Sequence, residues 1–242
     1  MHVWGEWGWA ASYGIGSVLC VVLLYSIFRL PQEKLKREEG PKVAFKLIVK
    51  ACFATLTLRN IIILGCVHGF SFGTINAVAS WLPLLLKELA LGEQATLWAM
   101  STGAVFFIAG FARILSGELG ARHRKIDVIL VCLFLSVLLL FAASFITNPH
   151  LVLMLGMGIG LVCGLSYSSV FILTSRFVIP GYMATGIGAM NTLANLINLI
   201  MVFILGLIRE RFESFSYGLL FMGCAALIVW LVALKNRKGL SQ

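Results

Sequence analysis

Charged residues are scarce in this sequence of 242 residues, and acidic residues are scarcer still. Asp, Glu, Lys and Arg make up 12% of the chain, against roughly 25% in a soluble globular domain, while hydrophobic residues make up 60% and the mean hydropathy is +0.98. None of the 10 Asp and Glu residues falls in the interior of a long apolar run. This composition excludes an ordinary soluble domain and indicates that the chain folds in a lipid bilayer.

Signatures of enzymes and of metal or nucleotide sites are also absent. The sequence has no HExxH, GxSxG or phosphate-binding loop, so we expect no enzymatic activity, no cofactor and no metal. The six cysteines form no CxxC pair, and we expect them to be reduced, small apolar residues. Gly156, Gly160 and Gly164 lie within an apolar run with no strand before them, so close helix packing is a better interpretation than a nucleotide loop.

Seven apolar runs are each long enough to cross a hydrocarbon core of roughly 30 Å as a helix. They lie at about residues 9–29, 60–86, 95–118, 127–147, 151–175, 183–208 and 215–234. The expected fold class is therefore an all-α polytopic membrane protein. Its expected parts are a first transmembrane helix (1–30), a cytoplasmic linker (31–59), a six-helix transmembrane bundle (60–235) and a cytoplasmic tail (236–242).

The linker contains a candidate amphipathic helix. Lys42, Lys46 and Lys50 are four residues apart and so share one helical face, while apolar residues occupy much of the rest. Such a helix is typical of a basic segment that lies on an anionic membrane surface. A soluble connector helix, or an early start to the next transmembrane helix, remains an alternative.

Successive loops between the apolar runs lie on alternate sides of the membrane, and the basic residues are concentrated in the loops of one side. Of the 19 Lys and Arg residues, 16 fall on the same side as the basic turn between Arg113 and Asp127, and 3 fall on the other side. Because cytoplasmic loops carry an excess of Lys and Arg, we expect a multi-pass protein of the cell (inner) membrane with its N-terminus outside and its C-terminus in the cytoplasm. The net charge of +9 then reflects topology, and we expect no nucleic-acid partner.

Several short motifs, taken in order, resemble those of the major facilitator superfamily. They are Glu6–Trp9, Pro31–Glu33, Arg59–Asn60, Trp81–Pro83, the glycine-rich run 151–175 and Gly186–Asn191. The first two look like the sixth helix of that family entering its long central loop, the next two look like its seventh helix, and the last two look like its tenth and eleventh. The resemblance covers the whole chain and implies the C-terminal six-helix half of the family's fold plus one helix.

The basic turn is similar to the loop signature G-x-L-x-D-R-x-G-R-K of the same family. Ala121 stands where the signature has aspartate, and the second glycine is missing, so the charge pairing made by that aspartate is lost. We expect Arg113 and Glu118, at the inner end of the helix, to pair with each other or with the turn. The candidate residues of this signature are Arg113, Gly117, Glu118, Leu119, Arg122, Arg124 and Lys125.

Polar side chains inside the apolar runs are the candidates for a substrate cavity, because a polar group in hydrocarbon needs a partner. Asn191, Asn195 and Asn198 share one helical stripe, which predicts either a cavity lining or a hydrogen-bonded seam between helices. His68 is the only titratable group well inside a run; it is a proton carrier, a substrate contact, or a histidine bonded to a neighbouring group. The full set is His68, Asn76, Thr102, Tyr167, Ser169, Asn191, Asn195 and Asn198.

The resemblance implies transport of a small solute by a secondary transporter of the bilayer. The family binds its substrate between two six-helix halves, so we expect a truncated or partial transporter that lacks an N-terminal six-helix partner. A seven-helix receptor or retinal protein is an alternative, although a retinal protein needs a lysine inside its last helix and Lys235 lies at the end. A non-transporting membrane remnant or scaffold is another, because it would keep the same interior polar residues.

Overall fold

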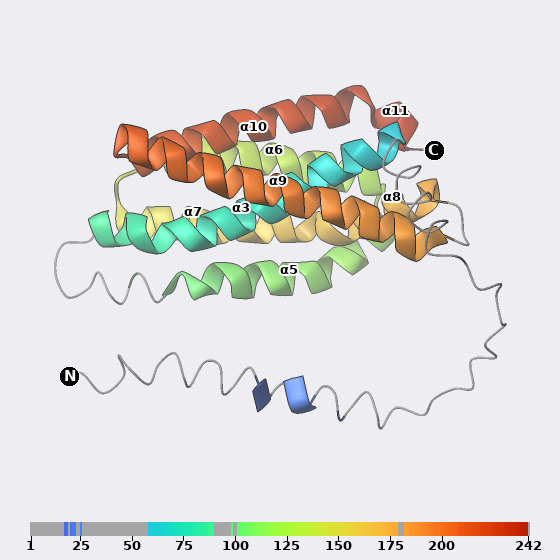
Figure 1. The fold of residues 1–242 in the computed structure, drawn as a ribbon, viewed down its shortest axis with the longest axis horizontal. Coiled ribbons are helices and arrows are strands. Elements are labelled where there is room, and N and C mark those ends of the chain that lie inside the picture. Colours follow the sequence, from blue (N-terminus) through green and yellow to red (C-terminus); the bar gives the residue numbers. More distant parts are fainter. Residues whose placement is uncertain are drawn as a thin grey trace. The chain divides into compact units, whose positions relative to one another are not determined.

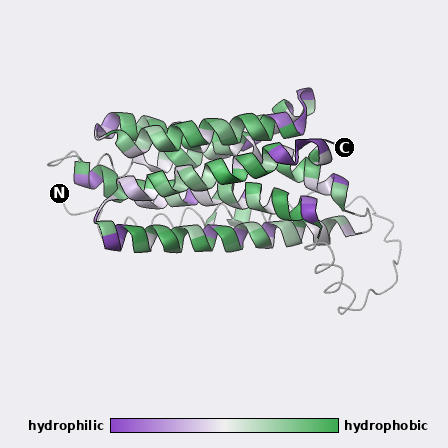
Figure 2. Cartoon of the chain, turned by 90° about the horizontal axis from the view of Figure 1, so that it is seen from above, coloured by the Kyte–Doolittle hydropathy of each residue, from purple (hydrophilic) through white to green (hydrophobic). Residues whose placement is uncertain are grey.

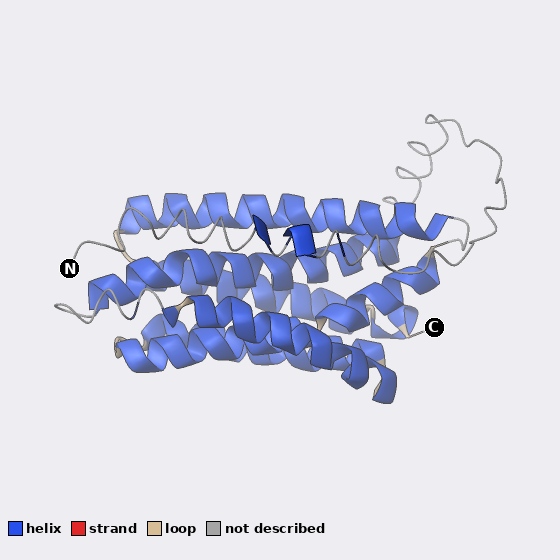
Figure 3. Ribbon diagram, turned by 90° about the horizontal axis from the view of Figure 1, so that it is seen from below, coloured by secondary structure: helices blue, strands red, loops and turns tan. Residues whose placement is uncertain are grey.

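The computed structural model describes residues 58–89, 98, 101–178 and 182–241, together with residues 17, 18, 20–22 and 25, which are helical. The expected first transmembrane helix and the linker with its amphipathic helix therefore lie almost entirely outside the described residues. The chain divides into two units, Met1–Ala44 and Phe45–Gln242, and the bundle of helices belongs to the second. Figure 3 shows the described residues as helices and loops, with no strand among them.

Among the described residues, six helical segments are long and apolar enough to cross a membrane. They are α3 (Arg59–Leu89), α5 (Gly103–Arg122), α6 (Lys125–Phe145), the consecutive pair α7 (Pro149–Leu165) and α8 (Tyr167–Phe177), α9 (Met183–Phe212) and α10 (Phe215–Lys235). A short helix, α11 (Arg237–Leu240), follows α10 (Figure 1). Each of these segments overlaps one of the six apolar runs from residue 60 onward, and the expected all-α polytopic membrane fold is confirmed.

Local sequence signals define the ends of several helices. The Asn148 side chain accepts a hydrogen bond from the backbone N–H of His150 (3.0 Å), and Pro149 occupies the first turn of α7, where its missing N–H would have had no helical partner. Later in the chain, α9 ends at Phe212 and is followed by Glu213, which has a left-handed backbone (φ 52°). Ser214 then caps α10. Short, capped connections of this kind favour antiparallel neighbouring helices.

Most of the basic turn expected after Arg113 is helical. Helix α5 continues to Arg122 and α6 begins at Lys125, so only His123 and Arg124 connect the two helices. The stretch has no proline, and its Arg, Leu and Ala residues favour a helix. Nothing in the sequence therefore ends α5 earlier, and most of the charges lie on helix ends.

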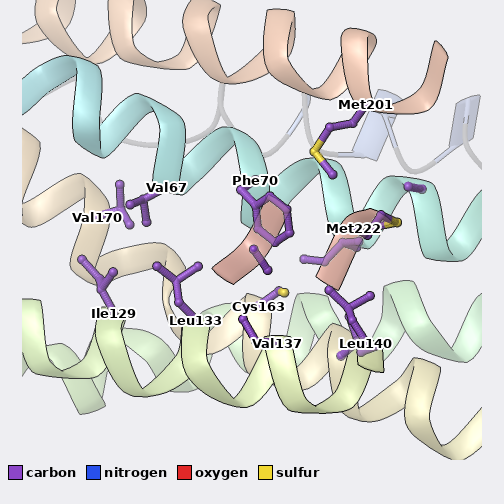
Figure 4. Close-up of a cluster of buried hydrophobic side chains, with 14 of the residues drawn as sticks. Val67, Phe70, Ile129, Leu133, Val137, Leu140, Cys163, Val170, Met201 and Met222 are labelled. Carbon is purple, nitrogen blue, oxygen red and sulfur yellow. The ribbon is translucent and has the colours of Figure 1, made fainter. Parts of the chain in front are cut away.

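The hydrophobic core surrounds α3, which packs against α7, α9 and α10, while α6 packs against α7 and α10. Figure 4 shows Ile129, Leu133, Val137 and Leu140 along one side of α6, directed toward the helix that carries Phe70. These four side chains are three or four residues apart, as expected for one face of a helix, and all are buried. Helix α6 thus contributes one face to the core, whereas α3 is buried on most of its sides.

The outer surface of the bundle is also apolar. The side chains of Phe107, Phe145 and Ile114 are 77%, 77% and 75% exposed, which a soluble protein would avoid. Figure 2 shows hydrophobic residues along the lengths of the helices and hydrophilic residues concentrated toward their ends. This pattern is that of a bundle whose outer faces contact lipid.

Glycines allow the closest helix contacts. A Cβ atom added at Gly160 would lie 2.9 Å from the Val105 carbonyl oxygen of α5, and one at Gly164 would lie 2.6 Å from the Ala109 carbonyl oxygen. At Gly156 it would lie 2.7 Å from Leu82 Cδ2 of α3. The prediction that these glycines serve close helix packing is confirmed.

A second row of glycines, on α3, was not recognised from the sequence. Gly65, Gly69 and Gly73 are four residues apart and all face α9. At Gly69 a Cβ atom would lie 2.9 Å from Ala194 Cα, so the backbones themselves approach closely. The regular spacing was the available signal, because small residues at every fourth position are typical of tightly packed membrane helices.

Candidate functional site around His68

The contact between α3 and α9 contains a polar pair. His68 Nε2 lies 3.3 Å from Asn191 Oδ1, and the His68 side chain is 2% exposed, whereas Asn191 is exposed. Two residues that the sequence nominated independently are therefore neighbours. Because an unpaired polar group in an apolar interior is costly, the pair satisfies part of the hydrogen-bonding requirement of the imidazole.

Three aromatic rings surround the imidazole. Tyr167 and Phe171 of α8 meet it edge to face, with ring centroids 5.2 Å and 5.1 Å away, and Phe72, one turn further along α3, stacks at 6.0 Å. These distances are within the range of favourable ring–ring contacts. Tyr167, a candidate from the sequence, thus belongs to the same site, and the two phenylalanines were not nominated because apolar residues give no functional signal.

A guanidinium group completes the cluster. The guanidinium carbon of Arg113, on α5, lies 4.6 Å from the centroid of the Tyr167 ring and 5.9 Å from that of Phe72. Its Nε atom is buried and has no hydrogen-bond partner. We call the six residues the His68 cluster: His68, Phe72, Arg113, Tyr167, Phe171 and Asn191.

Ser166 lies where α7 and α8 meet, beside the cluster, and directly precedes Tyr167. The Ser166 hydroxyl donates to the carbonyl of Cys163 (2.9 Å) and lies 3.4 Å from the hydroxyl of Ser71 on α3. The Ser166 backbone is helical (φ −76°, ψ −17°), so the segment Pro149–Phe177 continues through this position and carries Tyr167 in its next turn.

A pair of serines fixes α5 against α8 beside the cluster. The Oγ atoms of Ser116 and Ser168 are 2.5 Å apart, and the Ser168 backbone N–H donates to the Ser116 oxygen (3.2 Å). Each serine is close in sequence to a cluster residue, Arg113 or Tyr167. The serine pair therefore joins α5 and α8 close to the level of Arg113 and Tyr167.

The other cavity candidates lie outside the cluster. Asn195 is exposed and its amide donates to the carbonyl of Asn191 in the same helix (2.9 Å). Asn198 is half-buried beside Gly73 of α3, and its Oδ1 is buried without a hydrogen-bond partner. The asparagine stripe thus faces α3 at two of its three positions.

The remaining candidates are farther along their helices. Asn76 is half-buried eight residues beyond His68, about 12 Å along α3 at 1.5 Å per residue. Thr102 is buried at the start of α5, 11 residues before Arg113, or about 16 Å along the helix. Ser169 is fully buried, with its hydroxyl oxygen 3.2 Å from the position of a Cβ atom at Gly120, so it lies in the α5–α8 contact.

The loop-signature residues do not act as one group. Glu118 pairs with Arg122 one turn later (2.7 Å), with both side chains largely exposed, whereas Arg113 pairs with neither and contacts the aromatic rings. Arg122, Arg124 and Lys125 instead line a polar recess of about 470 Å³. Gly117 and Leu119, also in the signature, lie on α5, where Gly117 is exposed and Leu119 half-buried.

Two ion pairs between helix ends were not expected from the sequence. Glu88 of α3 pairs with Arg209 of α9, whose guanidinium carbon also lies 4.7 Å from the Phe215 ring centroid. Asp127, at the start of α6, pairs with Arg237 of α11 (2.8 Å). The partners are far apart in the sequence, so only the tertiary fold brings them together.

The structure thus defines a polytopic membrane protein with a small polar and aromatic cluster inside an apolar bundle. The sequence family described as the Major Facilitator Superfamily matches residues 2–202, and the chain belongs to this family of transporters. The protein called "Putative metabolite transport protein YyaJ", from Bacillus subtilis (strain 168), is 23% identical over 255 residues, which cover 91% of this chain and 55% of YyaJ. The chain therefore spans about half the length of this curated relative.

Proposed function

We propose that the chain takes part in the transport of a small solute as the C-terminal six-helix half, plus one helix, of a secondary transporter. The observation that carries this proposal is the His68 cluster, in which four helices direct polar and aromatic side chains to one place in an apolar bundle. Asn191, the cluster residue on α9, is exposed. A solute could therefore reach this residue.

We propose that an N-terminal six-helix partner supplies the other half of the substrate path. In transporters built from two repeats, the substrate site lies between the repeats near the middle of the membrane. The length of YyaJ, of which this chain spans 55%, is consistent with such a second half. The excess of Lys and Arg on one side supports an N-terminus outside the cell membrane and a cytoplasmic C-terminus.

Uptake into sealed vesicles tests the proposal. We would compare radiolabelled sugars, amino acids and carboxylates in vesicles containing the chain alone, or the chain co-produced with an N-terminal six-helix half. We expect uptake of one class of solute, reduced by Asn191→Ala by about five- to thirtyfold, the equivalent of losing a contact of about 1–2 kcal/mol. Asn195→Ala, four residues further along the same helix, is the matched control and should retain uptake.

The same experiment separates transport from a membrane scaffold. A scaffold would keep the polar cluster for packing, so it would show no uptake of any solute in either kind of vesicle. If uptake is unaffected by Asn191→Ala, the transport function is supported, but the assignment of the His68 cluster to the substrate path is contradicted.

A further inference from the structure

Three of the five described carboxylates are paired with arginines other than Arg113. The three ion pairs of the described residues are Glu88–Arg209, Glu118–Arg122 and Asp127–Arg237. The other two described carboxylates are exposed near the C-terminal end of α9, where Glu210 lies 19 residues, or about 28 Å, beyond Asn191. Within the described residues, Arg113 is thus a cation in a membrane-spanning helix without an anionic partner.

Such a cation needs compensation. Arginine within a transmembrane segment is costly and marks a functional position facing a cavity or a partner group. The rings of Tyr167 and Phe72 supply a cation–π contact, but the buried Nε atom still lacks an acceptor. The unfilled requirement is specific: an oxygen that accepts hydrogen bonds and carries negative charge.

The surroundings of the guanidinium group define the rest of the ligand. Stacking on an aromatic face leaves the edge of a guanidinium free for the two parallel hydrogen bonds that a carboxylate accepts. The neighbouring Phe72, Tyr167 and Phe171 rings offer an apolar wall, and Asn191 adds a polar side chain that is exposed. One uncompensated positive charge matches one negative charge, because a second one would be left unpaired at low dielectric.

We propose that the solute is a small organic monoanion whose carboxylate binds the guanidinium group of Arg113 while its apolar body lies against the rings of the His68 cluster. This inference rests on the proposed transport function and names the class of substrate. It also assigns Arg113 to recognition of the solute instead of to the charge pairing of the basic turn.

The test compares carboxylates with their neutral amides. The probes are benzoate with benzamide, lactate with lactamide, and the dianion succinate, at constant ionic strength. Binding is measured by thermal unfolding of the purified chain in detergent, and uptake is measured in vesicles with the co-produced N-terminal half. Arg113→Gln removes the charge, and Arg113→Lys keeps the charge but cannot form the two parallel hydrogen bonds of a guanidinium group. Arg122→Gln is a control on the same helix, and the side chain of Arg122 is exposed.

We expect at least one monocarboxylate to stabilise the chain at tenfold lower concentration than its amide or succinate, with about tenfold weaker binding in Arg113→Gln and unchanged binding in Arg122→Gln. If Arg113→Gln does not fold, the test uses the unmodified chain and Arg113→Lys. For each of them, binding of a carboxylate is compared with binding of its amide. Equal responses to a carboxylate and its amide, or equal anion binding by Arg113→Gln, would overturn the proposal.

Transport separates this inference from the proposed function. If the chain takes up a neutral solute and this uptake does not depend on Arg113, the transport function is supported and the proposal of an anionic solute is contradicted. If no solute is taken up although carboxylates still bind, the proposed transport function is contradicted instead. Loss of the carboxylate preference on co-production with the N-terminal half would mean that a protein carboxylate fills the place at Arg113, and would also overturn the proposal.

Discussion

His68 Nε2 and Asn191 Oδ1 lie 3.3 Å apart although 123 residues separate them in the sequence. They meet because Gly65, Gly69 and Gly73 bring the backbone of α3 close to α9. The glycine row and the polar pair therefore depend on each other. Close packing makes a short side-chain contact possible, and the contact gives the buried imidazole a partner.

We expect Asn191→Ala to destabilise the bundle by about 1–2 kcal/mol, because it leaves the buried His68 without its partner. Asn195→Ala should change the free energy of unfolding by less than about 0.5 kcal/mol, because Asn195 is exposed and bonds only within its own helix. Unfolding of both variants by graded addition of SDS, followed by circular dichroism, measures the difference. Equal losses in the two variants would contradict the assigned role of the His68–Asn191 contact.

We expect Gly164→Ala to destabilise the chain, because its Cβ atom would lie 2.6 Å from the Ala109 carbonyl oxygen and 2.8 Å from Ala112 Cβ. Overpacking of this kind costs about 1–3 kcal/mol, against a gain of about 1 kcal/mol from replacing glycine in a helix. Gly158→Ala, on the same helix, meets only Leu139, whose Cδ1 would be 3.5 Å away, and should be neutral or stabilising. In thermal unfolding of the purified variants in detergent, the midpoint temperature should therefore fall for Gly164→Ala and should stay unchanged or rise for Gly158→Ala.

The sequence was sufficient to predict the fold class and the six described membrane-spanning segments, because length and hydropathy determine which segments can cross a bilayer. It was also sufficient to nominate His68, Tyr167 and Asn191, because polar side chains inside apolar runs are conspicuous. The contact between the hydroxyls of Ser166 and Ser71 was not predicted, because the two residues come from different helices and only the tertiary fold brings them together.

The role of Arg113 could not be predicted for a different reason. In the sequence it stands five residues before Glu118 and close to three other basic residues, so pairing within the basic turn was the natural expectation. Its actual neighbours, Phe72 and Tyr167, come from two other helices. The packing of α5 against α7 and α8 determines which face of α5 is directed toward these rings. This packing cannot be predicted from the sequence of α5 alone.

We expect the turn between α5 and α6 to lie in the cytoplasm and the turn before α7 to lie outside. A fusion of alkaline phosphatase after Asn148 should be active, and one after His123 should be inactive, because this enzyme matures only outside the cytoplasm. Fusions of green fluorescent protein at the same two sites should give the opposite pattern. The reverse result at both sites would invert the topology that the distribution of Lys and Arg indicates.

The ion pair between Glu88 and Arg209 joins the C-terminal ends of α3 and α9, and we expect its two members to contribute unequally. Glu88 is 48% exposed and Arg209 29% exposed, so the charge pairing itself should contribute about 0–1 kcal/mol. Arg209 also lies over the Phe215 ring, a contact worth about 0.5–1 kcal/mol at a partly exposed site. Arg209→Met should therefore lower the free energy of unfolding by more than Glu88→Gln does.

A double-mutant cycle at low and high salt separates these two contributions. The coupling energy between Glu88 and Arg209 should be below about 1 kcal/mol and should shrink as salt screens the exposed carboxylate. The additional loss in Arg209→Met should persist at high salt and should disappear when Phe215 is already replaced by leucine. If Glu88→Gln and Arg209→Met cost the same at both salt concentrations, the ring contact contributes nothing, and the ion pair alone holds these two helix ends together.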